Sequence, residues 1–386
     1  MKRKRLLTLL GSVCLALMLA LPLVAGACAK AAPEGAAEEE IAALEAEIDE
    51  LEGDVTAKDA EISDLEDEIA TLRAPAEVYE WRLCSAYGGA TAWGDFTFGE
   101  ELGRASGGRI DVAVFSAGEL IGSGELLDAV GAGTMEFANC YPVLYPDLQL
   151  GAIEVGLPLS WQSTLEADML WEQWGFSDLI SESYMEHNTH YLGPYFAGPM
   201  VLITTVPISS LDDLRKLKIR ATAAIGEMLL NVGVATTYIP FEDIFLALET
   251  GTIDGAICGS GAEYEEMGFQ EAAPYYCTSP IIVNPLVTSY IINQDAWDEL
   301  PDDLNAIVES VSYDARWRYG IWAQAAEYAA LERAFKGTLT SLPPEDMATL
   351  TEMALAVWEE EAAKSALRAE AIEILKDLQR TMGRLD

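Results

Sequence analysis

From residue 79 onward, short β-prone runs alternate with amphipathic helical runs, and this alternation constrains the fold more than any other feature. The strand-like runs are "YEWRLCSAY", "GGRIDVAVF", "TMEFANCY", "LKIRAT", "TTYIP" and "TIDGAICG". Helical patterns such as "SGELLDAVGAG", "AIGEMLLNVG" and "FEDIFLALETG" lie between them and end in glycine. The alternation predicts an α/β fold. Roughly 310 residues follow the N-terminal region, which favours two lobes over one.

Two later segments are expected to cross between the lobes. Residues 198–208 and 279–293 are β-rich and interrupted by proline, as hinge strands tend to be. A long helical stretch follows Pro301, with acidic residues in its first turn, and is expected to span both lobes. The predicted boundaries are 78–197 with 285–323 for lobe I, and 198–284 with 324–386 for lobe II.

The first 27 residues have the pattern of an export signal. Four basic residues precede an apolar run, and small residues come before Cys28. A cysteine at this position is typical of a bacterial lipoprotein, so we expect Cys28 to be lipidated. The alternative is an ordinary signal peptide followed by an unmodified cysteine.

Residues 28–77 are expected to form a linker and a coiled-coil stalk. Between residues 34 and 73, sixteen acidic residues face only Lys58 and Arg73. Isoleucine, valine and leucine recur there with 3-then-4 spacing, with Lys58 in the single polar core position. The positions on either side of these apolar residues are mostly acidic, so two identical helices would repel one another. Two readings stay open: a solvated spacer helix, and a weak homodimer.

The charge of the chain limits its partners. The formal net charge is −41, and removal of the basic signal region would make it more negative. Such a charge argues against nucleic acid and anionic membrane surfaces as partners. It suits an exported, soluble protein.

Few residue patterns indicate catalysis or metal binding. His187 and His190 could share a metal ion with Glu186, but no additional ligands have a suitable spacing, and a polar turn is the favoured interpretation. No nucleophile elbow, phosphate-binding loop or CxxC motif is present. We therefore predict no enzyme activity, no cofactor and no metal site. The pairing state of four cysteines stays open: Cys84, Cys140, Cys258 and Cys277.

Three stretches together resemble one family. They are "SGGRIDVAVFSAGEL", "ISSLDDLRKLKIRATAAIGEMLLNVGVATTYIPFEDIFLALETGTIDGAICGS" and "YIINQDAWDELPDDLNAIV". Their order and spacing are similar to the dicarboxylate-binding (DctP-like) substrate-binding proteins of tripartite ATP-independent periplasmic (TRAP) transporters, over roughly residues 80–345. The resemblance implies a two-lobed periplasmic-binding-protein-like fold that closes over its ligand. It also implies that Arg220, the arginine of "KIR", pairs with a ligand carboxylate.

Further candidate contacts lie near predicted strand ends, where open α/β sheets bind ligands. These are Tyr87, Asn139, Tyr141, Phe241 and Cys258. In one branch of the family an acid and an aromatic residue help to hold a cation beside a keto acid, but here Ile257 and Cys258 align with them. Glu263 lies in a following segment that still resembles this branch. The presence of a cation is therefore left open.

The predicted function is an extracytoplasmic, lipid-anchored protein that captures a small organic acid and delivers it to TRAP membrane subunits. The alternative is a ligand-sensing module on a stalk that signals to a membrane partner. The identity of the ligand is not predicted.

Overall fold

The computed structural model describes residues 36–73, 77–88 and 92–385. The predicted export signal, the lipidation site at Cys28 and the end of the stalk at 74–76 lie outside these residues. The chain divides into two compact units, 1–76 and 77–386, and each is described by itself. Within the described residues, no helix combines the length and apolar character needed to cross a bilayer.

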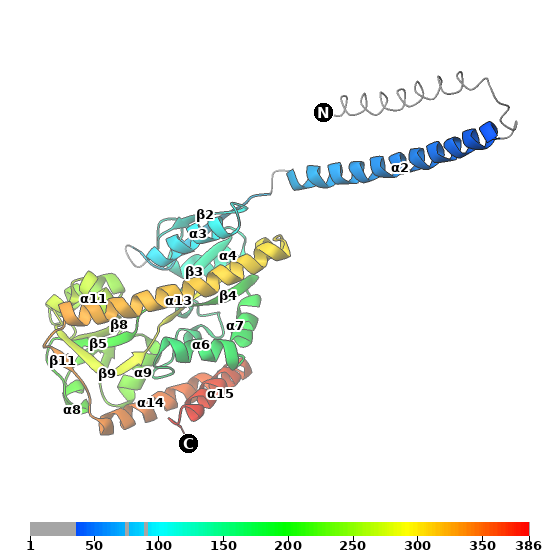
Figure 1. Ribbon diagram of the computed structural model, residues 1–386. Helices are drawn as coiled ribbons and strands as arrows, with labels where there is room; N and C mark the ends of the chain where they lie inside the picture. The colour runs from blue at the N-terminus through cyan, green and yellow to red at the C-terminus, as the bar shows by residue number, and fades with distance from the viewer. Residues whose placement is uncertain (1–35, 74–76, 89–91, 386) are drawn as a thin grey trace. The chain divides into compact units, whose positions relative to one another are not determined.

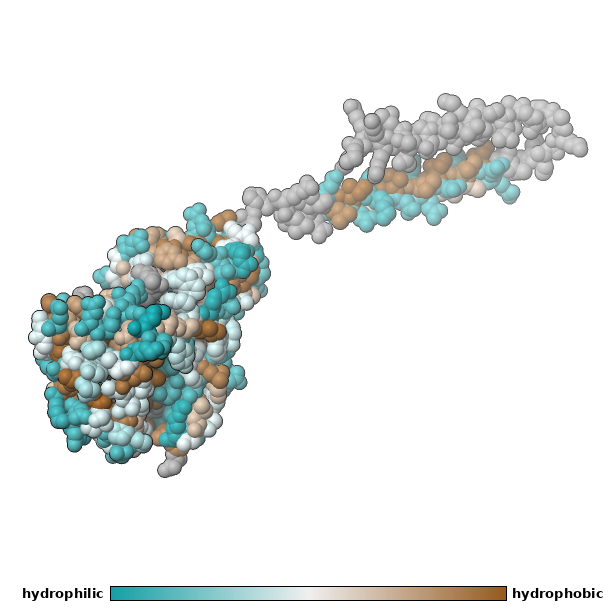
Figure 2. All heavy atoms as spheres, turned by 60° about the vertical axis from the view of Figure 1, so that its left-hand side comes forward, coloured by the Kyte–Doolittle hydropathy of each residue, from teal (hydrophilic) through white to brown (hydrophobic). Residues whose placement is uncertain are grey.

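The first unit is represented by one helix, α2 (Ala36–Arg73). At about 1.5 Å per residue its 38 residues extend about 57 Å. An apolar row follows the helix, visible as a brown line in Figure 2, and its side chains are about half exposed. The row comprises Ile41, Leu44, Ile48, Leu51, Val55, Ile62 and Leu65. The helical part of the stalk prediction therefore agrees with the structure, while coiled-coil pairing stays a prediction.

The second unit has an α/β fold, as the alternation predicted, and contains two mixed β-sheets (Figure 1). The first sheet has the order β2-β1-β3-β10-β4. Strands β1, β2 and β3 run parallel, whereas β10 is antiparallel to β3 and β4. The bounds are β1 Tyr79–Ser85, β2 Ile110–Phe115, β3 Phe137–Cys140, β4 Thr189–Phe196 and β10 Val287–Asn293.

The second sheet has the order β11-β9-β5-β8-β6-β7. Strand β5 is antiparallel to β8 and β9, while β6 is parallel to β7 and β8. The bounds are β5 Met200–Thr204, β6 Lys218–Arg220, β7 Ala235–Thr237, β8 Gly255–Gly259, β9 Tyr275–Val283 and β11 Leu339–Thr340.

The chain crosses between the sheets at the two segments expected to act as hinges. The first crossing joins β4 to β5, and the second joins β9 to β10. The crossings are hydrogen-bonded to each other, because Ala197 N–H donates to Leu286 O at 2.9 Å and Leu286 N–H donates to Gly198 O at 3.0 Å. The two connections therefore form one local unit.

Helices of the first half cover the first sheet and its flank. Helix α3 packs on β2, and α7 packs on β4. Their bounds and those of the neighbouring helices are α3 Trp93–Ala105, α4 Leu126–Gly131, α5 Gly151–Glu154, α6 Thr164–Gln173 and α7 Phe176–Met185. The buried faces of α3 and the sheet share an aromatic cluster in which Phe98, Phe137 and Tyr290 are in mutual ring contact.

Most helices of the second half pack around the second sheet, but α12 (Gln294–Asp298) packs on β4 and β10 of the first. The bounds are α8 Leu211–Leu214, α9 Ala223–Asn231, α10 Ile244–Glu249, α11 Gly261–Glu266 and α12 Gln294–Asp298. Short 3₁₀ turns complete the chain at Ser123–Glu125, Pro142–Leu144, Phe241–Asp243 and Phe269–Glu271. The apolar side chains of β5 and β8 and those of α10 and α11 form one buried cluster.

The long helix α13 (Asp302–Arg333) contacts elements of both sheets, as expected. It packs against α3 and β4 of the first group and against α11 of the second (Figure 1). Arg316 fixes it to α6, since its Nη2 lies 2.8 Å from Asp168 Oδ1 and 2.6 Å from Glu172 Oε1.

The C-terminal helices α14 (Pro344–Ala362) and α15 (Ala366–Thr381) also contact both groups. Helix α14 packs on α9, while α15 packs on α5, α6 and α7. Trp358 Nε1 donates to Pro158 O at 3.0 Å, and Arg384 pairs with Glu166 at 2.7 Å. The tail therefore joins helices of the two groups, and the lobe boundaries drawn from the sequence stay a prediction.

Candidate ligand-binding cleft

A cleft of about 1020 Å³ is lined by side chains from both sheets. Tyr87 and Tyr141 follow β1 and β3, and Thr288 belongs to β10. Arg220 and Cys258 come from β6 and β8 of the second sheet. Because the parallel strands of both sheets direct their carboxyl ends to this hollow, it has the position expected for a ligand site in an α/β protein.

Backbone carbonyl groups hold the Arg220 guanidinium in the cleft wall. Arg220 is the last residue of β6, and its Nε donates to Ile239 O at 3.0 Å while Nη1 donates to Ile257 O at 3.3 Å. Its Cζ lies 5.1 Å from the ring centroid of Tyr238, within the range of a cation–π contact. The side chain is only 5% exposed. Its orientation is therefore fixed before any ligand arrives.

No carboxylate of the described residues forms an ion pair with Arg220, although the chain holds 64 acidic residues. The similarly buried Arg316, at 4% exposure, pairs with both Asp168 and Glu172. A buried charge without an opposite charge costs free energy. An anionic group that enters the cleft would recover part of this cost.

Two further oxygen atoms in the cleft wall lack hydrogen-bond partners. The Tyr87 hydroxyl and Thr288 Oγ1 are buried near each other, and neither makes a hydrogen bond of normal geometry with a described residue. Buried polar groups are normally paired, so these atoms are suited to a polar ligand or bridging water. Sequence reasoning missed Thr288, whose only signal is a hydroxyl residue within an apolar hinge segment.

Tyr141 and Cys258 are predicted site residues that the structure brings beside Arg220. Burial raises the pKa of the Tyr141 hydroxyl and of the Cys258 thiol to about 12 each. The positive charge of Arg220 opposes both shifts, and the negative charge of Glu263 adds to them. Both groups are therefore neutral near pH 7, and the Tyr141 hydroxyl can donate a hydrogen bond.

Glu263 also lines the cleft. It lies in the first turn of α11, where its Oε2 accepts hydrogen bonds from Ser260 N at 2.8 Å and Ser260 Oγ at 2.9 Å. Ser260 Oγ in turn accepts from Glu263 N–H, which completes a capping box. Burial raises the pKa of the carboxyl group, and the Ser260 contacts oppose that shift.

Phe241 and Asn139 have different surroundings. Phe241 lines the cleft, is 37% exposed, and contacts Phe269 with ring centroids 5.7 Å apart. Asn139 is fully buried and is not among the residues that line the cleft. Its amide nitrogen donates to both carboxylate oxygens of Asp95, at 2.9 and 3.1 Å. Asp95 also accepts from the Tyr290 hydroxyl at 2.7 Å, so Asn139 contributes to a buried network that joins β3, β10 and α3.

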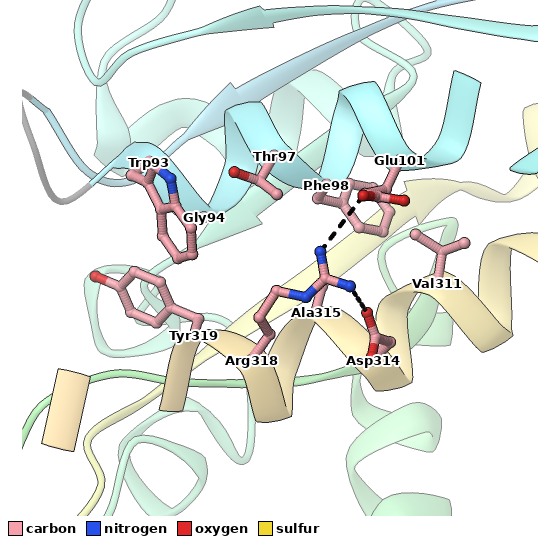
Figure 3. Close-up of a pocket in the computed structure, with 10 residues that line it drawn as sticks. All are labelled: Trp93, Gly94, Thr97, Phe98, Glu101, Val311, Asp314, Ala315, Arg318 and Tyr319. Carbon is pink, nitrogen blue, oxygen red and sulfur yellow. Dashed lines mark hydrogen bonds and ion pairs between the residues drawn. The ribbon is translucent and has the colours of Figure 1, made fainter. Parts of the chain in front are cut away.

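A second hollow lies between α3 and α13 (Figure 3). Arg318 crosses it and pairs with Asp314 at 2.5 Å and Glu101 at 3.5 Å. The volume of this hollow is about 10 Å³, which leaves room for about one water molecule. It is therefore too small to hold an organic solute.

The two histidines are not assembled into a metal site within the described chain. His190 lies in β4 and stacks on Trp297 with ring centroids 4.0 Å apart, and burial lowers the pKa of His190 to about 4. The described residues contain no group of three or more histidine, cysteine, aspartate or glutamate side chains suited to a metal ion. Cys84, Cys140, Cys258 and Cys277 are free thiols.

Comparison with known proteins gives a consistent result. Residues 96–365 match the model of a family described as bacterial extracellular solute-binding protein, family 7. A monocarboxylate 2-oxoacid-binding periplasmic protein of Nostoc sp. is 25% identical over 295 residues, which cover 74% of this chain and 80% of that protein. The ectoine-binding periplasmic protein TeaA of Halomonas elongata is 26% identical over 220 residues, which cover 54% of this chain and 62% of that protein.

A solved structure shows the same architecture. It is a TRAP periplasmic solute binding protein from Chromohalobacter salexigens with bound (S)-(+)-2-amino-1-propanol. The TM-score is 0.71 at 25% identity, and the match covers 80% of this chain and 97% of the other. This likeness accounts for both sheets and the helices around them.

Proposed function

The chain belongs to the bacterial extracellular solute-binding proteins of family 7, and we propose that it captures a small organic acid in the cleft and delivers it to TRAP membrane subunits. Members of this family bind solutes outside the cytoplasm for transporters and are not enzymes. The prediction of an extracytoplasmic binding protein without catalytic activity is thereby confirmed, while the ligand and the membrane partners are part of the proposal.

The proposal rests mainly on the buried, unpaired guanidinium of Arg220. A guanidinium that is 5% exposed, fixed by two carbonyl groups and without a carboxylate partner among the described residues lines a cleft of about 1020 Å³. Its planar shape can bind a carboxylate through two parallel hydrogen bonds, which fixes the orientation of the ligand as well as its charge.

The other proposed contacts surround this anchor. The Tyr141 and Tyr87 hydroxyl groups can donate hydrogen bonds, and Cys258 and Phe241 provide apolar surface. Thr288 joins this set because its hydroxyl group is buried and unpaired. Glu263 is proposed as the polar contact opposite the arginine, and Asn139 is omitted because Asp95 already binds its amide.

The relatives support a small polar solute. By their names, the Nostoc protein binds 2-oxo monocarboxylic acids and the Halomonas protein binds ectoine, and the Chromohalobacter structure holds an amino alcohol. All three ligands would fit within a cleft of about 1020 Å³.

We further propose that the lobes close over the ligand. Lobe I would comprise 78–197 with 285–323, and lobe II 198–284 with 324–386. The paired crossings near Ala197 and Leu286 would act as the hinge, because they are the short connections between the sheets. A ligand that contacts Thr288 and Arg220 together would favour the closed form.

We also propose that a lipid attaches the protein to the membrane. The export signal of 1–27 would be removed, Cys28 would carry the lipid, and residues 28–77 would hold the binding domain away from the membrane. The apolar row of α2 would allow weak self-association, which its acidic flanks would oppose.

The proposal is tested by native mass spectrometry of the purified full-length protein. We expect a mass increase from a bound small acid in the wild type and its loss in Arg220→Ala. If the same acid stays bound to a folded Arg220→Ala variant with equal occupancy, the proposed role of Arg220 is wrong.

A further inference from the structure

The charges in the cleft indicate more about the ligand than that it is an acid. Among the residues that the structure describes, three that line the cleft are charged: Arg220, Glu227 and Glu263. A site for a dicarboxylate would be expected to offer two cationic or several donor groups. This site instead offers one cation and two carboxyl groups.

Glu263 and Arg220 lie near the same side chains without pairing with each other. Both charges influence the hydroxyl group of Tyr141 and the thiol group of Cys258, with opposite effects on their pKa values. No ion pair of 4 Å or less joins Arg220 to Glu263 among the described residues. Two opposite charges therefore face the same part of the cleft across a gap.

The Glu263 carboxylate has capacity for another donor. Its Oε2 receives the Ser260 hydrogen bonds, whereas Oε1 receives none from the described residues. No lysine or arginine of the described chain pairs with it either; the neighbouring Glu265, by contrast, pairs with Arg333 at 2.5 Å. Glu263 is thus an acidic counterpart to the unpaired guanidinium.

Glu227 is a weaker candidate for this role. The neighbouring carboxyl group of Glu360 raises the pKa of Glu227 above its usual value. Glu263, by contrast, acts on the Tyr141 hydroxyl and the Cys258 thiol beside Arg220. Glu263 is therefore the acid that most strongly affects a bound solute.

We propose that the preferred ligand is a small zwitterion, whose carboxylate binds Arg220 and whose cationic nitrogen binds Glu263. The aromatic rings of Tyr141 and Tyr87 would flank the nitrogen, where ring faces attract cations. A nitrogen-free acid would leave Glu263 unpaired, and a dicarboxylate would bring a second negative charge toward it. This inference rests on the proposed function, because it assumes that Arg220 holds the carboxylate.

Calorimetric titration of the full-length protein with matched ligand pairs tests the inference. The pairs are L-alanine with pyruvate and L-leucine with 4-methyl-2-oxopentanoate, and ectoine is a further zwitterion. At least one zwitterion should bind about tenfold or more tightly than every 2-oxo acid. If no zwitterion exceeds the 2-oxo acids, the inference is overturned.

Glu263→Gln is the decisive variant, because glutamine preserves the capping box but removes the charge. It should weaken zwitterion binding about tenfold more than it changes 2-oxo acid binding. Glu266→Gln is the matched control, since Glu266 is an exposed residue of the same helix outside the cleft. Equal losses in the two variants, or no loss in Glu263→Gln, would contradict the assignment.

The Arg220→Ala variant distinguishes failure of the zwitterion assignment from failure of the proposed function. If it weakens pyruvate binding while zwitterions show no advantage, the proposed function stands and the zwitterion assignment fails. If it changes neither class, the proposed function fails as well.

Discussion

Replacing Glu154 with glutamine is predicted to change how the stability of the protein depends on pH. Glu154 is fully buried at the end of α5, and its carboxylate accepts hydrogen bonds from the Ser289 and Tyr184 hydroxyl groups. Burial raises the pKa of Glu154 from 4.5 to about 7, and the hydroxyl contacts with Ser289, Tyr184 and Tyr191 limit this rise. The neighbouring groups that can titrate, Cys140, Tyr184 and Tyr191, are all neutral below pH 8 because burial raises their pKa values.

Proton linkage determines whether the unfolding free energy rises or falls with pH. Between pH 4.5 and about 7 the folded protein holds a proton on Glu154 that the unfolded chain has released. The free energy of unfolding therefore falls as the pH rises through this window. The rise in pKa from 4.5 to about 7 corresponds to about 3.5 kcal/mol at most, since one pKa unit is about 1.4 kcal/mol.

The assay is urea denaturation of wild type and Glu154→Gln between pH 4.5 and 8.5. Glutamine cannot ionise, so the variant does not lose this stability as the pH rises. Between pH 4.5 and 8.5 its unfolding free energy should therefore increase by about 2–3 kcal/mol relative to that of the wild type. Other buried acids, such as Asp95 and Glu327, affect both proteins equally and cancel in the difference. A difference that stays constant with pH would refute the reasoning.

Three further predictions concern regions outside the core. Cys28→Ser should release the protein from the membrane fraction, whereas membrane association that persists, with no acyl mass on the wild type, would contradict lipidation. Residues 34–73 should self-associate weakly at neutral pH and low salt and more strongly in high salt or near pH 4, where acidic flanks are screened or protonated; sedimentation that is unchanged across these conditions would rule this out. Small-angle scattering should show a smaller radius of gyration at ligand saturation, and an unchanged radius would argue against hinge closure.

Local periodicity was sufficient to predict most elements of the fold. The strand that ends at Arg220 and the long helix after Pro301 have clear boundaries in the sequence, and the structure contains both as β6 and α13. The two proline-interrupted segments also proved to be the crossings between the sheets. These features depend on residues close in sequence, where strand alternation and helix signals are informative.

Side-chain pairing between distant segments was not predictable. Asn139 ends a strand and seemed available to a ligand, but Asp95 from α3 binds its amide. Thr288 looked like one more residue of a hinge strand, yet its hydroxyl is buried in the cleft wall without a partner. Both outcomes depend on which side chains the tertiary fold brings together, and strand position alone carries no such information.

The buried position of Glu154 has the same origin. In the sequence "GAIEVG" this glutamate could equally face solvent. It is enclosed because α5 packs beside α15 and Ser289 lies opposite on β10, and these segments are far apart in the chain.

The most direct test of the account is the affinity of Arg220 variants for a carboxylate, measured by calorimetry. The probe is whichever of pyruvate, L-alanine and ectoine binds the wild type most tightly. Arg220→Ala should weaken binding by about 2–5 kcal/mol, the range for removing one partner of a buried charge pair, and Arg220→Lys should recover only part of this loss. Lys218→Ala is the matched control, because it removes a positive charge from an exposed position of the same strand and should bind normally. If a folded Arg220→Ala variant binds within threefold of wild type, Arg220 does not anchor the ligand and the central claim is contradicted.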